Sequence, residues 1–84
     1  MSLKSKFSRE LYHARMKHKK ANASTAYKYT QRSVAAAVKI TEQYYQRIES
    51  GKKFPSPELL FKLCKLLEID MNQFKDEVEV DEIK

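Results

Sequence analysis

The stretch TQRSVAAAVKITEQYYQRIESGKKFPSPELLFKLCKLLEID, which covers residues 30–70, decides the fold of this chain. Thr30 and Thr41 each stand before a short run with apolar residues on one helical face, and a threonine hydroxyl can cap the first turn of a helix. We therefore expect a short helix after Thr30 that stops around Lys39. A tight turn and a second helix, which ends at Ser50 and Gly51, are expected to follow.

The strongest helix-start signal comes after this pair of helices. Pro55 disfavours a helical conformation in the residue before it, and Ser56, Pro57 and Glu58 supply a cap, a first-turn proline and an acidic group at the positive helix end. The helix that follows has the broadest apolar face in the chain, so it is expected to form the spine of the core. That face comprises Leu59, Leu60, Leu63, Cys64, Leu66 and Leu67.

Weaker patterns flank this region. Upstream, Phe7, Leu11 and Ala14 share one helical face and predict a first helix from about Lys6 to Lys20. The stretch Ala21 to Tyr29 mixes small and polar residues without a period, which indicates a loop or a frayed helix extension. Downstream, Asp70 and Gln73 have capping-box spacing and predict a fifth helix that contains Met71, Phe74 and Val78.

Together these elements predict an all-α fold, a compact bundle of about five short helices without strands. Residues 1–84 are expected to form a single domain with a core at about residues 7–75, a two-helix motif at 30–50 and an acidic tail at about 76–84. A chain this short buries only about 60–65% of the surface that its unfolded form exposes. A deep enclosed substrate cleft is therefore not expected.

Charge is unevenly distributed along the chain. The 84 residues have 17 Lys and Arg against 11 Asp and Glu, a net charge of +6. Residues 1–53 carry 13 basic and 3 acidic side chains, a net +10, whereas residues 54–84 carry 4 basic and 8 acidic ones, a net −4. A strongly basic front part is typical of proteins that contact nucleic-acid phosphates, although a solvated basic surface is the simpler alternative.

The composition also argues against other classes of protein. The single cysteine, Cys64, cannot form an intramolecular disulfide, and no apolar run is long enough for a signal peptide or a membrane span. We therefore expect a cytoplasmic protein without membrane contact. Cys64 is expected to be a buried hydrophobic residue; a reactive thiol is the alternative, but no His neighbours it in sequence.

Catalytic and metal-binding patterns are not found. His13 and His18 are five residues apart and do not share a helical face, and Gly51 is the only glycine, which excludes a glycine-rich phosphate loop. Glu42 and Glu49 are seven residues apart and Glu42 is expected to be exposed, so no acid and base couple is expected. We expect no enzyme activity, no cofactor and no metal.

The helix after Thr41 has a polar outer face that suits the major groove of DNA. If Tyr45 and Ile48 point inward, Glu42, Gln43, Gln46 and Arg47 are left exposed. Arg47 suits guanine, Gln43 suits adenine and Glu42 can accept from cytosine. The Tyr44 side chain could meet a thymine methyl group and a phosphate, or simply cover the turn. An ordinary solvated helix face is the alternative interpretation.

At this point the sequence resembles a known family, the helix-turn-helix DNA-binding domain of the phage Cro and repressor type, or XRE family. The likeness extends from about Leu11 to Phe74. It rests on Thr30, Gln31, Ala35, Val38, Ile40, Thr41, Ile48, Glu49, Gly51, Lys52, Pro55 and Ser56.

The resemblance implies a lambda-repressor-like domain of five helices. It also implies sequence-specific binding of double-stranded DNA, by a transcriptional regulator that represses a small operon or mobile element and acts as a homodimer. By position, Gln31 and Lys52 match phosphate-binding residues, Thr41 matches a backbone contact, and Glu42, Gln43, Tyr44 and Arg47 match base-facing positions. Lys39 and Lys53 complete the expected DNA-binding set, and Arg15 with Glu49 matches a structural salt bridge.

The sequence departs from the family pattern in three places. About nine extra residues, Ala21 to Tyr29, precede the second helix. Lys39 stands where the family has a glycine, at a cost of about 1 kcal/mol for a positive φ, and Ser50 stands where Asn is common.

Two other functions remain open. One is an antitoxin-type module that neutralises a partner protein, and a weaker one is binding of single-stranded RNA. The antitoxin function would call for a long extension to wrap the partner, and only about ten residues follow Lys75. The aromatic residues do not form a stacking platform for RNA bases.

Overall fold

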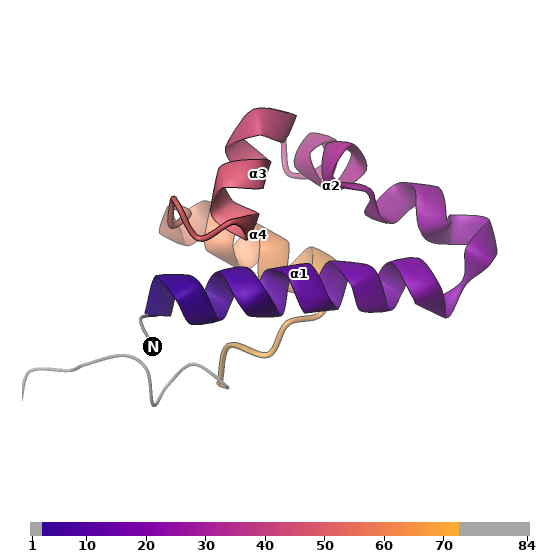
Figure 1. Cartoon of the computed structure of the whole chain (residues 1–84), viewed down its shortest axis with the longest axis horizontal. Helices are drawn as coiled ribbons and strands as arrows, with labels where there is room; N and C mark the ends of the chain where they lie inside the picture. Colours follow the sequence, from indigo (N-terminus) through magenta and orange to yellow (C-terminus); the bar gives the residue numbers. More distant parts are fainter. Residues whose placement is uncertain (1–2, 73–84) are drawn as a thin grey trace, which may run out of the picture.

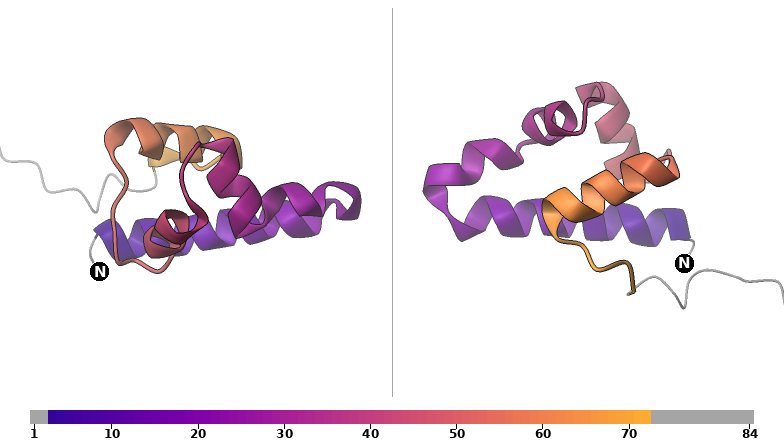
Figure 2. Two further views of the ribbon diagram at one scale, coloured as in Figure 1. Left: turned by 90° about the horizontal axis from the view of Figure 1, so that it is seen from above. Right: turned by 180° about the vertical axis from the view of Figure 1, so that it is seen from behind.

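The computed structural model describes residues 3–72, and this part of the chain is helical, without strands. The elements are α1 (Leu3–Ala21), the 3-10 helix η1 (Ala23–Tyr29), α2 (Gln31–Ala37), α3 (Glu42–Glu49) and α4 (Pro57–Leu67). The predicted all-α fold is confirmed. In Figure 1, α1 forms a long base, α2 and α3 lie on one side of it, and α4 packs behind; Figure 2 shows the same arrangement from above and from behind.

Three helices begin where the capping residues predict. The Thr30 hydroxyl accepts a hydrogen bond from the backbone N–H of Ser33, the Thr41 hydroxyl accepts one from Tyr44, and the Ser56 hydroxyl accepts one from Leu59. Each bond satisfies a backbone donor that the first turn of a helix leaves unpaired.

The core forms where α1, α2, α3 and α4 meet. Its largest fully buried side chains are Tyr45, Phe7, Leu11, Ile48, Leu63, Leu67 and Val34. The ring of Phe7 also packs edge-to-face on Phe54, with the centroids 5.7 Å apart. Cys64 is buried as expected, and burial raises the pKa of its thiol, which opposes formation of a reactive thiolate.

The chain ahead of α2 differs from the prediction. Helix α1 runs from Leu3 to Ala21 instead of Lys6 to Lys20. The stretch Ala21 to Tyr29, expected to be a loop or a frayed helix extension, contains the ordered 3-10 helix η1. Its start is fixed by Asn22, whose side-chain oxygen accepts a hydrogen bond from the N–H of Ser24.

The far end of η1 is held by tertiary contacts that no local pattern reveals. The ring of Tyr29 stacks on His18, with the centroids 5.0 Å apart. His18 in turn places Nε2 2.9 Å from the Leu67 carbonyl oxygen, so α1 connects η1 to α4.

Among residues 3–72, three adopt the left-handed backbone conformation. Lys39, in the turn between α2 and α3, has φ 62°, Glu68, which ends α4, has φ 56°, and Gly51, after α3, has φ 80°. Helix α2 stops at Ala37, slightly before the predicted end at Lys39. At Gly51 a side chain would be strained by φ, and its Cβ would lie 3.2 Å from the Ser8 hydroxyl oxygen.

The predicted fifth helix is only partly within the described residues. Asp70 accepts a hydrogen bond from the N–H of Asn72 through its side chain, and Met71 packs against the core. Gln73, Phe74, Val78 and the acidic tail lie outside the described residues. Within residues 3–72, no helix has the length and apolar character needed to cross a membrane.

Candidate nucleic-acid interface

Helix α3 places an apolar face in the core and a polar face outside. Tyr45 and Ile48 are 0% and 1% exposed, whereas Gln43, Gln46 and Arg47 are exposed. The two buried residues of this eight-residue helix are three positions apart and therefore lie on one face. The opposite face is left outside the core. Glu42, at the start of α3, is half-buried rather than fully exposed as expected.

Most of the candidate DNA-binding residues gather around two neighbouring hollows on the outer side of α3. One hollow is lined by Thr41, Gln43, Tyr44, Arg47 and Lys53. The other is lined by Gln43, Gln46, Arg47, Ser50 and Lys52. Gln43 and Arg47 border both, so the two groups best suited to reading base edges lie at the centre of this surface.

The lysines after α3 are fixed by the backbone. The N–H groups of Lys52 and Lys53 both donate to the Arg47 carbonyl oxygen, at 2.9 and 3.2 Å. The Lys53 ammonium lies 5.2 Å from the centroid of the Tyr44 ring, within range of a cation–π interaction. Tyr44 is half-buried and packs against the core while still bordering the hollow.

Lys39 lies apart from this group. It lines a different hollow, between the end of α2 and α4, together with Ala37, Lys62, Lys65 and Leu66. The structure therefore does not bring Lys39 together with the candidates that surround Gln43 and Arg47.

A buried ion pair fixes α3 on α1. Arg15 donates from Nε and Nη2 to the two carboxylate oxygens of Glu49, at 2.9 and 2.7 Å. The two side chains are 7% and 6% exposed. A third guanidinium nitrogen, Nη1, donates to the Tyr29 carbonyl oxygen at 3.1 Å, so the same residue also holds the end of η1. Such bidentate geometry is the strongest form of an Arg–carboxylate contact.

The ionisation of this cluster follows from these contacts. The hydrogen bonds that Arg15 donates to Glu49 raise the pKa of Arg15 against the opposing effect of burial. Burial by itself would raise the pKa of Glu49, but the hydrogen bonds from Arg15 and the other contacts outweigh it, so that pKa is lowered. Burial and the nearby Glu49 carboxylate raise the pKa of Tyr45. Its hydroxyl has no hydrogen bond of regular geometry to a described residue.

Gln31 is engaged inside the protein. Its Nε2 donates to Glu49 Oε1 at 3.2 Å, and its Oε1 accepts from Gln46 Nε2 at 3.3 Å. Gln46 also lies 3.4 Å from Glu42 Oε2, and Arg32 Nε lies 3.5 Å from Glu42 Oε1. The first turn of α2 is thereby joined to the outer side of α3. The sequence placed Gln46 on the exposed polar face but did not indicate its contact with Gln31, 15 positions away, or the contact of Arg32 with Glu42, 10 positions away.

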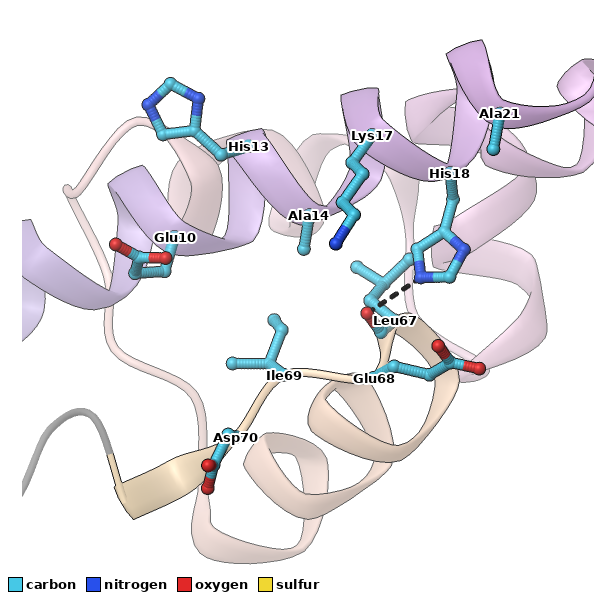
Figure 3. A pocket seen from close by; sticks show the side chains of 10 residues that line it. All are labelled: Glu10, His13, Ala14, Lys17, His18, Ala21, Leu67, Glu68, Ile69 and Asp70. Atoms are coloured by element: carbon cyan, nitrogen blue, oxygen red, sulfur yellow. Dashed lines mark hydrogen bonds between the residues drawn. The ribbon is translucent and has the colours of Figure 1, made fainter.

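A separate groove lies between α1 and the end of α4 (Figure 3). It is lined by Glu10, His13, Ala14, Lys17, His18, Ala21, Leu67, Glu68, Ile69 and Asp70. Although it contains both histidines and several carboxylates, no group of three potential metal ligands comes together within residues 3–72.

One family model, described as helix-turn-helix, matches residues 25–74 of the chain. No curated protein and no solved structure gave a significant match. The matched segment includes α2, the turn, α3 and α4, together with most of η1.

Proposed function

The chain belongs to the helix-turn-helix family of the Cro and repressor (XRE) type, a family of DNA-binding regulators, and from this premise we propose that it is a sequence-specific repressor. In this proposal α3 enters the major groove of duplex DNA. The observation that carries it is the outer side of α3, where Gln43 and Arg47 line two hollows together with Tyr44, Lys52 and Lys53. An exposed polar helix face bordered by cations is what major-groove reading requires.

The geometry supports separate roles for the side chains. Arg47 can donate two hydrogen bonds to guanine O6 and N7, and Gln43 can pair with adenine N6 and N7. In this proposal Lys52 and Lys53, which follow α3, contact phosphates, and Tyr44 and Thr41 line the same hollow as Lys53. Phosphate contacts position a protein on DNA, whereas base contacts give it specificity.

Two of the expected contacts have internal roles in the free protein. Gln31 bonds Glu49 and Gln46, and Glu42 lies against Gln46 and Arg32. These contacts hold α2 against α3. We therefore assign Gln31 and Glu42 mainly to positioning the recognition helix and treat contact with DNA as their secondary role. Lys39 lies apart from the central group and would reach only a phosphate.

The proposed active form is a homodimer on a near-palindromic operator. One such module covers only about 600–1,000 Å² of a DNA interface, which is small for a specific complex. Phe61 on α4 is 64% exposed and is available for contact with a second copy.

The full chain, mixed with a random pool of duplex DNA, tests the proposal. Selection of one short motif, with affinity that weakens steeply as salt concentration rises, is expected because Lys and Arg contacts release counterions. Recovery of no motif at all, or affinity that does not change between low and physiological salt, would overturn it.

A further inference from the structure

Between Leu11 and Thr41 the chain contains seven Lys and Arg residues and no Asp or Glu. Arg15 is buried against Glu49, and Lys39 lies in the turn after α2. Of the other five, Lys17, Lys19 and Lys20 lie in the last turns of α1, Lys28 lies in η1, and Arg32 lies in the first turn of α2. Residues 19–29, here named the arm, extend past α2 on the side away from α3 (Figure 1).

The arm is held in place by hydrogen bonds and stacking. The Ser33 hydroxyl donates to the Tyr27 carbonyl oxygen at 2.7 Å, and Arg15 donates to the Tyr29 carbonyl oxygen at 3.1 Å. The stacking of Tyr29 on His18 adds a contact with α1. A segment that is already ordered loses less conformational entropy when it binds than a flexible one would.

Two exposed side chains on the arm have no role in the core. Tyr27 is 66% exposed, and the exposed Lys28 places Nζ 6.0 Å from the centroid of its ring. An ammonium group and a tyrosine hydroxyl are both donors that commonly bind phosphate oxygens. They occur here side by side without a carboxylate nearby in the sequence.

A continuous series of contacts joins this pair to the outer side of α3. The Tyr27 carbonyl is bonded to Ser33, in the first turn of α2. Arg32, in the same turn, lies 3.5 Å from Glu42 at the start of α3. These contacts connect the arm, through the first turn of α2, to the start of α3.

We propose that the arm binds the phosphate backbone of duplex DNA beyond the base pairs that α3 contacts, with Lys28 and Tyr27 as the binding groups. The inference rests on the proposed function and extends it to the flanks of the operator. Because phosphates carry no sequence information, the arm would add affinity and salt dependence without changing which bases are preferred.

A charge reversal on the arm is compared with a matched reversal elsewhere on the chain. The arm variant is Lys28→Glu, and the control is Lys17→Glu, since Lys17 is exposed and lines the groove between α1 and the end of α4 (Figure 3). Both variants change the net charge by the same amount. Each is titrated with two duplexes that carry the selected motif, one trimmed to the motif and one with several extra base pairs on each side.

The wild type and the control are expected to bind the longer duplex more tightly than the trimmed one, whereas Lys28→Glu loses that preference. On the longer duplex, the log-log salt slope of Lys28→Glu should be smaller in magnitude than that of the control by about 0.9 or more. The motif selected from a random pool should be the same for all three proteins. Tyr27→Phe, which removes only the hydroxyl, should weaken the preference for the longer duplex.

Equal behaviour of Lys28→Glu and Lys17→Glu on both duplexes would overturn the proposed role of the arm while leaving DNA binding by α3 intact. A change of the selected motif in Lys28→Glu would also overturn it, because that would be a role in base reading. Failure of the wild type to bind any duplex would instead contradict the proposed function itself. Circular dichroism melting of both variants identifies any loss of folding.

Discussion

Arg15 on α1 donates two hydrogen bonds, of 2.9 and 2.7 Å, to Glu49 at the end of α3, and this buried pair sets the position of the recognition helix. The same guanidinium donates to the Tyr29 carbonyl oxygen, and Glu49 also accepts from Gln31. Four elements, α1, η1, α2 and α3, therefore meet at one ion pair. The helix that exposes the polar face is therefore held in position by a charged pair that is almost fully buried.

Removal of one partner of this pair should strongly destabilise the fold. We expect Arg15→Ala to lower the free energy of unfolding by about 3 kcal/mol or more, because the Glu49 carboxylate is left buried without its cation. Urea unfolding followed by circular dichroism measures the change. The double variant Arg15→Met/Glu49→Leu, which buries no charge, should recover much of the loss. Equal stability of Arg15→Ala and the wild type would mean that the pair does not support the fold.

The ion pair also predicts how stability depends on pH. The pKa of Glu49 is lower in the folded protein than in the unfolded chain, so its contribution is present above the unfolded pKa of about 4.3 and is lost as pH falls through the folded value. The difference in unfolding free energy between the wild type and Glu49→Gln should therefore shrink below about pH 4. Urea titrations at several acidic pH values measure it, and a difference that stays constant with pH would contradict the assignment.

The turn between α2 and α3 contains a backbone conformation that lysine adopts at a cost. Lys39 has φ 62°, where a residue with a Cβ is strained by about 1–2 kcal/mol. We expect Lys39→Gly to raise the stability of the protein by about 1 kcal/mol and Lys39→Ala to leave it nearly unchanged. Thermal melts of the two variants make the comparison. If Gly and Ala gave the same stability, strain at this position would be negligible.

Local chemistry explains why some of this structure could be predicted from sequence. Three helix starts could be predicted from the capping residues Thr30, Thr41 and Ser56, because a capping side chain accepts a hydrogen bond from an N–H only three residues away. The inward positions of Tyr45 and Ile48 follow from helical spacing alone. For the same reason the exposed side of Gln43 and Arg47 could be anticipated.

Other features depend on residues that are distant in sequence. Tyr29 is fixed by Arg15 and His18, 14 and 11 positions earlier, so the order of η1 could not be read from its mixed composition. The Arg15–Glu49 pair spans 34 positions and was expected only through the family resemblance. The left-handed end of α4 at Glu68 had no glycine to indicate it.

Binding as a dimer predicts a defined stoichiometry. With the recognition helices of two copies in successive major grooves, the half-sites should be about 34–36 Å apart, or one turn of duplex. Sedimentation of the protein with the selected duplex should give two chains on one symmetric site. Phe61→Glu places a charge on an exposed apolar position of α4. It should weaken formation of the two-to-one complex more than it lowers the stability of the folded monomer. A strict one-to-one complex on a motif without inverted symmetry would exclude the dimer.

The central claim, that α3 reads bases while the lysines after it hold phosphates, is tested most directly by the motifs that Arg47→Ala and Lys52→Ala select from one random duplex pool. Arg47→Ala is expected to lose preference at a single base pair per half-site and to bind the original motif about 1–3 kcal/mol more weakly. Lys52→Ala should select the original motif unchanged, with uniformly weaker binding and a smaller salt slope. An unchanged motif for Arg47→Ala would contradict the assignment of α3 as the recognition helix.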